Sequence, residues 1–157
     1  GLVGSEMCIR DRSKIANNIV IKVPLTEHGL IACKNLSKKS IKVNVTLCFS
    51  SSQALIAAKM GATYISPFIG RLDDISNEGL NLIEEIITIY NNYPDRLSTE
   101  VLVASIRSPL QVAQVAQMGA DVATIPPKII KQMIKHPLTD IGLNSFMEDW
   151  KKTGQNF

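Results

Sequence analysis

Residues 19–26 read IVIKVPLT, a run of β-branched residues interrupted by a single lysine. Successive side chains of a β-strand point to opposite faces. Ile21 and Val23 therefore share one face of this run, and Lys22 lies on the other. The run predicts a strand with one apolar face and one face that carries a lysine.

Four further β-rich runs follow, so strands are expected at residues 19–23, 42–47, 63–68, 100–107 and 121–125. Helical patterns separate them at residues 26–36, 54–60, 78–90 and 110–118. Thr26 suits the start of the first helix, and Pro109 suits the first turn of the last. Gly61 and Gly119 follow two helices at positions that favour a left-handed residue. Strands that alternate with helices imply a parallel sheet.

Polar side chains share one face of several predicted strands. By the period of two, the groups expected together are Asn44 with Thr46, Tyr64 with Ser66 and Phe68, and Val103 with Ser105 and Arg107. An open, doubly wound sheet has helices on both faces and favours apolar residues on each. A barrel explains the polar groups better, because its strand ends lie beside the loops that form active sites.

We therefore predict an α/β fold of the (β/α)8 TIM-barrel type. Such a barrel has eight strands and about 250 residues, whereas five strands are recognised among these 157 residues. The prediction is a truncated barrel that holds about the last five β/α units, with three strands expected upstream. The residues expected to converge at the carboxyl ends of its strands are Lys22, Thr46, Ser66, Phe68, Ser105 and Arg107.

Composition narrows the possible partners. Hydrophobic residues make up 45% of the chain and charged residues 20%, with a net charge of +3, which is typical of one globular domain. The Lys and Arg residues are scattered, so nucleic acid is not expected as a partner. No apolar run approaches the roughly 20 residues that cross a membrane. The three cysteines have no metal-ligand spacing, so we expect no metal, and they fit a reducing cytoplasm.

Residues 1–12 read GLVGSEMCIRDR and have neither helical nor strand periodicity. The string resembles translated sequencing-adapter read-through, so we expect a non-native segment at 1–12 and a partial barrel domain at 13–157. On that interpretation the natural protein begins further upstream. The alternative is a native N-terminal segment, because chain ends are often poorly ordered.

Four motifs carry a specific resemblance. They are IVIKVPLT, VNVTLCFS, ISPFIGRLDD and VASIRSP, in this order, and HPLTDIGLNSFMEDW follows near the end of the chain. Together they resemble the small transaldolase family, which includes the fructose 6-phosphate aldolases. The resemblance implies a (β/α)8 barrel that is cytoplasmic, homo-oligomeric at full length and free of metal or organic cofactors.

The activity implied by the resemblance is a step of the pentose phosphate pathway. A dihydroxyacetone unit passes from sedoheptulose 7-phosphate to glyceraldehyde 3-phosphate, which yields erythrose 4-phosphate and fructose 6-phosphate. The unit is carried as a lysine Schiff base. Two alternatives stay open: an aldolase that uses free dihydroxyacetone, and a fragment that binds phosphate sugars without chemistry.

Lys22 is the residue to which the resemblance assigns the Schiff base. The alternative is a lysine that extends to solvent, as most do. A nucleophilic lysine needs a neutral amine, and burial in a barrel mouth favours that form. By resemblance, Asn44 binds substrate hydroxyls and Thr46 helps to hold the catalytic water. Either could instead be an ordinary polar residue at a strand end.

Arg71, Ser105 and Arg107 are expected to bind the substrate phosphate. Guanidinium groups present a planar fork of donors that matches phosphate oxygens, and a hydroxyl adds one more bond. The resemblance points to the same three residues, whereas the alternative for both arginines is an ordinary surface charge. Asp73 and Asp74 follow the first arginine motif, and a solvated loop is expected there.

Ser66 and Phe68 are expected to line the substrate site. Phe68 resembles the transaldolases, whereas a tyrosine at this position resembles the relatives that use free dihydroxyacetone. The acid-base residues that the family carries on its earlier strands are not found upstream of Lys22. General acid-base catalysis contributes about 10² to 10⁴ in rate. We therefore expect this chain alone to be inactive and poorly stable.

Overall fold

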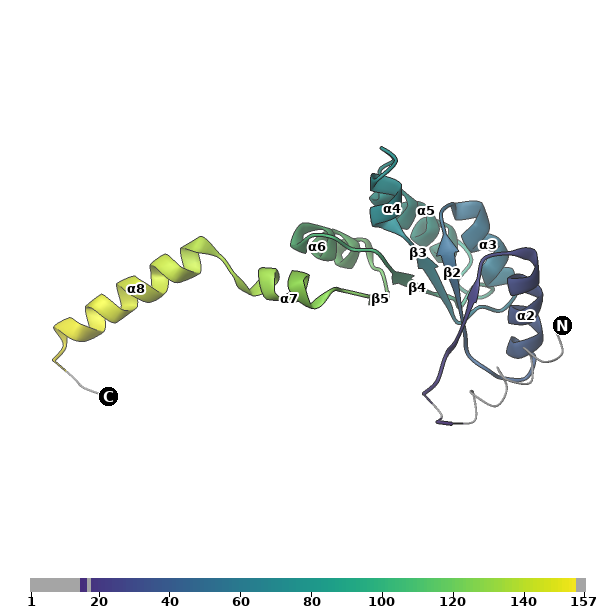
Figure 1. The fold of residues 1–157 in the computed structure, drawn as a ribbon, viewed down its shortest axis with the longest axis horizontal. Coiled ribbons are helices and arrows are strands. Elements are labelled where there is room, and N and C mark those ends of the chain that lie inside the picture. Colours follow the sequence, from purple (N-terminus) through teal and green to yellow (C-terminus); the bar gives the residue numbers. More distant parts are fainter. Residues whose placement is uncertain (1–14, 17, 155–157) are drawn as a thin grey trace. The chain divides into compact units, whose positions relative to one another are not determined.

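The computed structural model describes residues 15–16 and 18–154 (Figure 1). The chain divides after Ile125 into two compact units, residues 1–125 and 126–157. All the strands and all the predicted site residues belong to the first unit. The predicted non-native segment at residues 1–12 lies outside the described residues.

The first unit is built on a parallel five-stranded sheet in the order β1-β2-β3-β4-β5, as predicted. Its strands are β1 (Ile21–Pro24), β2 (Val43–Cys48), β3 (Tyr64–Pro67), β4 (Glu100–Val103) and β5 (Val122–Ala123). Each strand therefore pairs with the next strand along the chain.

Four of the helices that connect the strands were predicted, namely α2 (Glu27–Ser37), α3 (Ser51–Lys59), α5 (Gly79–Asn91) and α6 (Pro109–Met118). The short helix α4 (Ile69–Asp73) was not predicted. The Thr26 hydroxyl accepts a hydrogen bond from a backbone N–H in the first turn of α2, and Ser108 does the same for α6. Gly61 and Gly119 have φ of 82° and 90°, which confirms the predicted left-handed helix exits.

One face of the sheet forms the core with helices α2, α3 and α5. The strand residues buried in it are Ile21, Val23, Val43, Val45, Ile65, Val101 and Val103. Tyr90 of α5 donates a hydrogen bond of 2.8 Å to the carbonyl of Ala54 in α3, so a polar contact joins two of these helices. Cys33 and Cys48 are free and buried in this core, as predicted.

The other face of the sheet carries the polar side chains, as the period of two predicts. Lys22 is in register with Asn44, and Asn44 with Tyr64. Residues in register on parallel strands point to the same side, so Lys22 lies on the face opposite the helical core. Lys22 and Glu100 are exposed there.

The fourth strand is shorter than predicted. β4 ends at Val103, whereas residues up to 107 were expected to be extended. Val103 is fully buried in the helical core, and Ser105 has φ of 64°. A left-handed residue reverses the chain and breaks the alternation of side chains. The prediction that Val103 shares a face with Ser105 and Arg107 is therefore wrong.

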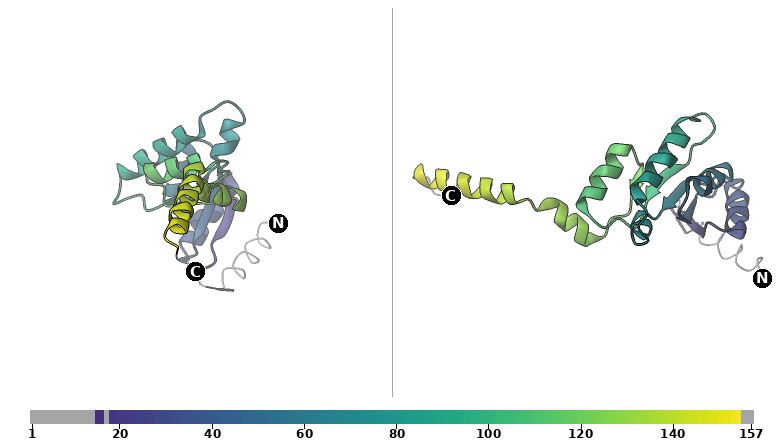
Figure 2. Two further views of the ribbon diagram at one scale, coloured as in Figure 1. Left: turned by 90° about the vertical axis from the view of Figure 1, so that its left-hand side faces the viewer. Right: turned by 90° about the horizontal axis from the view of Figure 1, so that it is seen from above.

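The second unit contains two helices that the sequence analysis did not delimit, α7 (Pro127–Ile134) and α8 (Pro137–Lys152). Figure 2 shows α8 in yellow as a regular helix, and His136 caps its start by accepting from the N–H of Leu138 at 3.2 Å. Within residues 15–16 and 18–154, no helix has the length and apolar character that a membrane span requires.

Candidate functional site

A row of polar side chains crosses three neighbouring strands. The Ser66 hydroxyl donates a hydrogen bond of 2.9 Å to the amide oxygen Oδ1 of Asn44. Ser66 is buried and Asn44 is half-buried. This bond restrains the orientation of the Asn44 amide, whose NH₂ group is a hydrogen-bond donor. Lys22 stands beside Asn44 in register, so an amine and an amide donor lie side by side.

Thr46 lies one step further toward the carboxyl end of β2, in register with Pro24 and Ser66. Its side chain is 8% exposed, and among the described residues its Oγ1 is the one buried side-chain N or O atom without a hydrogen-bond partner. An unsatisfied buried hydroxyl costs about 1 to 3 kcal/mol, and such atoms often mark functional positions. Thr46 therefore has a hydroxyl whose hydrogen-bonding capacity is unused within the described residues.

Lys22 is more exposed than expected. Burial of its amine was predicted from the barrel, yet the side chain is exposed. The physical reason is its position in the sheet, because α2, α3 and α5 cover the face on which its neighbours Ile21 and Val23 are buried. Among the described residues Lys22 is exposed and lies on the predicted face, and its burial in the mouth of a closed barrel stays a prediction.

An aromatic cluster follows β3. Phe68 comes directly after that strand and bridges to Ala104. Its ring centroid lies 6.1 Å from that of Phe49, at an interplanar angle of 59°. The guanidinium carbon of Arg71 lies 5.2 Å from the Phe68 centroid, within the range of a cation–π contact. Arg71 is thereby held near the end of β3 by an aromatic face.

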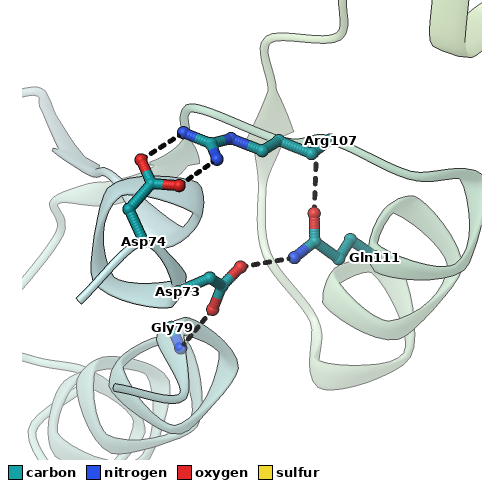
Figure 3. A network of polar contacts seen from close by, with 5 residues as sticks. All are labelled: Asp73, Asp74, Gly79, Arg107 and Gln111. Carbon is teal, nitrogen blue, oxygen red and sulfur yellow. Dashed lines mark hydrogen bonds and ion pairs between the residues drawn. The ribbon is translucent and has the colours of Figure 1, made fainter. Parts of the chain in front are cut away.

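Arg107 forms a two-point ion pair with Asp74 (Figure 3). Its Nη1 donates to Asp74 Oδ1, and its Nη2 donates to Oδ2 at 2.6 Å. The hydrogen bonds from Arg107 hold the pKa of the Asp74 carboxyl below its ordinary value, and they raise the pKa of Arg107. The side chains of Arg107 and Asp74 are about half exposed, at 50% and 49%, so the acidic segment is solvated as expected, and Asp74 in addition pairs with Arg107.

Gly70 brings Ser105 and Arg107 together. Its N–H donates to the carbonyl of Ser105 at 3.1 Å. A Cβ at position 70 would lie 2.9 Å from Ser105 Oγ and 2.6 Å from Arg107 Nε. The Ser105 hydroxyl and the Arg107 Nε therefore both lie next to the Cα of Gly70. Two hydrogen-bond donors thus lie close together at the start of helix α4.

The predicted site residues thus form two groups. The polar face of β1 to β3 carries Lys22, Asn44, Thr46 and Ser66, whereas α4 and the segments that follow β3 and β4 carry Phe68, Arg71, Ser105 and Arg107. Sequence reasoning missed the roles of Gly70 and Asp74, although both lie within the quoted motif ISPFIGRLDD. Residues 15–16 and 18–154 contain no group of three or more His, Cys, Asp or Glu side chains arranged to hold a metal ion.

Fold and site together define an α/β protein whose parallel sheet carries a row of polar side chains on one face. Residues 7–157 match the family model described as "Transaldolase/Fructose-6-phosphate aldolase". The chain belongs to this family, which confirms the resemblance read from the four motifs.

Several relatives support this assignment. A "Probable transaldolase" of Chelativorans sp. (strain BNC1) is 62% identical over 143 residues, covering 91% of this chain and 65% of the relative. One of Thermoanaerobacter sp. (strain X514) is 56% identical over 145 residues, covering 92% of this chain and 66% of the relative. The chain therefore spans about two thirds of the length of these relatives.

A solved structure shares the fold. It is titled as a 4-hydroxy-2-oxoglutarate aldolase/2-deydro-3-deoxyphosphogluconate aldolase, and it aligns with a TM-score of 0.58 at 18% identity. The alignment covers 78% of this chain and 53% of that one. At this identity the likeness concerns the fold alone.

Proposed function

We propose that this chain supplies five β/α units of a (β/α)8 barrel that transfers dihydroxyacetone between sugar phosphates, with Lys22 as the Schiff-base residue. The observation that carries the proposal is the row of Lys22, Asn44 and Ser66 on the polar face of the sheet. Family membership supports the reaction class. The cytoplasmic location and the homo-oligomeric state stay predictions.

The proposed chemistry begins at the Lys22 amine. The neutral amine attacks the ketose carbonyl to give a carbinolamine, which loses water to form the Schiff base. Loss of the proton from the C4 hydroxyl then breaks the C3–C4 bond, which releases an aldose phosphate and leaves the electron pair in a three-carbon enamine on the lysine. The enamine then attacks the aldehyde carbon of the acceptor, and hydrolysis of the new Schiff base frees both product and enzyme.

Asn44 and Thr46 would serve this sequence by hydrogen bonding. The Asn44 NH₂ is oriented by the bond that its oxygen accepts from Ser66, so it can donate to a substrate hydroxyl beside Lys22. The unpartnered Thr46 hydroxyl can hold the water that enters and leaves during Schiff-base formation and hydrolysis. Ser66 acts mainly by fixing the orientation of Asn44.

The phosphate is assigned to Arg71, Ser105 and Arg107. Arg71 lies in helix α4, which follows β3, and Ser105 and Arg107 lie in the loop that follows β4. Phosphate oxygens match the donor geometry of arginine. Phe68 supports this group through its contact with Arg71. The family description also includes fructose-6-phosphate aldolase, which makes cleavage to free dihydroxyacetone the second candidate reaction.

Borohydride trapping tests the proposal. Reduction of the full-length protein in the presence of fructose 6-phosphate should leave a covalent three-carbon adduct on Lys22, located by mass spectrometry of peptides. Lys22→Met should abolish the adduct and the turnover. Lys59→Met, which changes an exposed lysine at the end of α3, is the matched control and should retain both. An adduct on another lysine, with Lys22→Met still active, would overturn the assignment.

A second assay separates the two reactions. Three-carbon transfer to glyceraldehyde 3-phosphate is compared with release of free dihydroxyacetone from fructose 6-phosphate. Transfer should be the faster reaction. Faster release would favour the aldolase and would leave the role of Lys22 unchanged.

A further inference from the structure

The proposed phosphate site of Arg71, Ser105 and Arg107 is called the phosphate clamp below. The ion pair with Asp74 occupies one edge of the Arg107 guanidinium group in this clamp. A guanidinium group has five N–H donors, and Asp74 accepts from both terminal nitrogens of Arg107. The remaining Nε faces the bare Cα of Gly70 beside the Ser105 hydroxyl. The Asp74 carboxylate therefore occupies an edge of Arg107 that could otherwise make a two-point contact to an incoming phosphate.

Both partners of this pair are anchored through their backbones (Figure 3). The Arg107 N–H donates to Gln111 Oε1 at 2.8 Å, and Gln111 Nε2 donates to Asp73 Oδ2 at 2.8 Å. Asp73 also accepts from the N–H of Gly79 at 2.9 Å, which fixes the start of α5. Asp74 caps α4 through its own N–H, which donates to the carbonyl of Gly70. The network therefore holds the carboxylate next to the guanidinium.

A phosphate can nevertheless replace Asp74 on Arg107 at little cost in stability. Both side chains are about half exposed, and ion pairs at such positions contribute little to stability because solvent screens them. A phosphate dianion carries more charge than a carboxylate and fits the same fork of donors. A substrate phosphate can thus displace Asp74 from Arg107, but it binds more weakly than it would to a free guanidinium.

Weaker phosphate binding suits a transfer reaction. The phosphate takes no part in bond making or breaking, and it is present on both substrate and product. Interactions that are equally strong in the ground state and the transition state lower KM without raising kcat. A competing carboxylate reduces this uniform binding and speeds the release of phosphorylated product.

We propose that Asp74 is a built-in competitor for the substrate phosphate on Arg107, and that it sets how tightly the site holds phosphorylated ligands. The proposal rests on the phosphate clamp put forward under the proposed function. It predicts that removing the Asp74 charge strengthens the binding of phosphate, whereas a residue that only positions Arg107 would, when changed, weaken it.

The test compares Asp74→Asn and Asp74→Ser with the unchanged full-length protein. Calorimetric titration with inorganic phosphate should give a Kd about two- to fivefold lower in both variants, as expected when an exposed competing pair is removed. The KM for glyceraldehyde 3-phosphate should fall by a similar factor, and that for unphosphorylated glyceraldehyde should not change. Asp149→Asn is the control, because it removes the same charge from the exposed pair with Lys152 and should leave both constants unchanged.

The outcomes separate this inference from the proposed function. Arg107→Ala is measured alongside, with thermal unfolding of every variant as the folding control. If phosphate binding weakens in Arg107→Ala but does not strengthen in either Asp74 variant, the proposed competing role of Asp74 is wrong and the phosphate clamp is supported. If Arg107→Ala binds phosphate as well as the unchanged protein, the clamp itself is wrong and the inference falls with it.

Discussion

Replacing Gly70 by alanine should disturb the fold and the phosphate site together. A Cβ at this position would lie 2.3 Å from the carbonyl oxygen of Ser105, closer than Cβ atoms are found to such atoms, and 2.6 Å from Arg107 Nε. The arginine side chain can move aside, but the carbonyl belongs to the backbone. The loop after β4 must therefore shift away from α4.

The expected magnitude follows from this clash. Overpacking typically costs about 1 to 3 kcal/mol, and the better helix propensity of alanine offsets up to about 1 kcal/mol. A net loss of about 1 to 2 kcal/mol in the free energy of unfolding should lower the Tm by about 2 to 8 °C in a domain of this size. Phosphate should also bind more weakly, because the shift separates the Ser105 hydroxyl from Arg107.

The assay is thermal and urea unfolding of Gly70→Ala, together with phosphate titration. Gly142→Ala is the matched control, because the added Cβ meets no heavy atom within 4 Å in helix α8. It should leave the Tm unchanged or slightly raised. If Gly70→Ala melted no lower than the unchanged protein and bound phosphate equally well, the close approach of α4 to the Ser105 loop would not matter.

Three further predictions concern single side chains. Arg107→Ala and Arg71→Ala should each raise the KM for glyceraldehyde 3-phosphate about tenfold and leave that for glyceraldehyde unchanged, since a charge-assisted hydrogen bond to the phosphate is lost. An equal rise in both KM values would indicate a role in folding. Tyr90→Phe removes the 2.8 Å hydrogen bond that joins α5 to α3 and should cost about 0.5 to 1.5 kcal/mol in urea unfolding, whereas an unchanged midpoint would contradict it. Burial raises the pKa of Cys33 and Cys48 from 9.0 to about 11, so their contribution to stability is complete below pH 9 and is lost as the pH rises through 11. At pH 8 about one thiol in 1,000 is ionised, so iodoacetamide should modify both only after unfolding, and rapid native labelling would refute their burial.

Local rules in the sequence were enough to determine which strand residues face the core and where several helices begin and end. Alternation along a strand follows from covalent geometry, so Ile21 and Val23 could be assigned to the core and Lys22 to the opposite face. Helix ends likewise depend on a few adjacent residues. Thr26 was therefore recognised as a cap, and Gly119 as a left-handed exit.

Contacts between distant segments were decided only by the tertiary structure. Ser105 has a left-handed φ, and its carbonyl accepts a hydrogen bond from Gly70, which lies 35 positions earlier, so no local pattern signals this end of β4. The pairing of Arg107 with Asp74 joins residues 33 positions apart, and the order and register of the parallel strands bring them together. The sequence by itself determined which residue types face the site. Only the tertiary structure decided which of them touch, because side-chain pairing depends on backbone turns and strand register that no short stretch of sequence encodes.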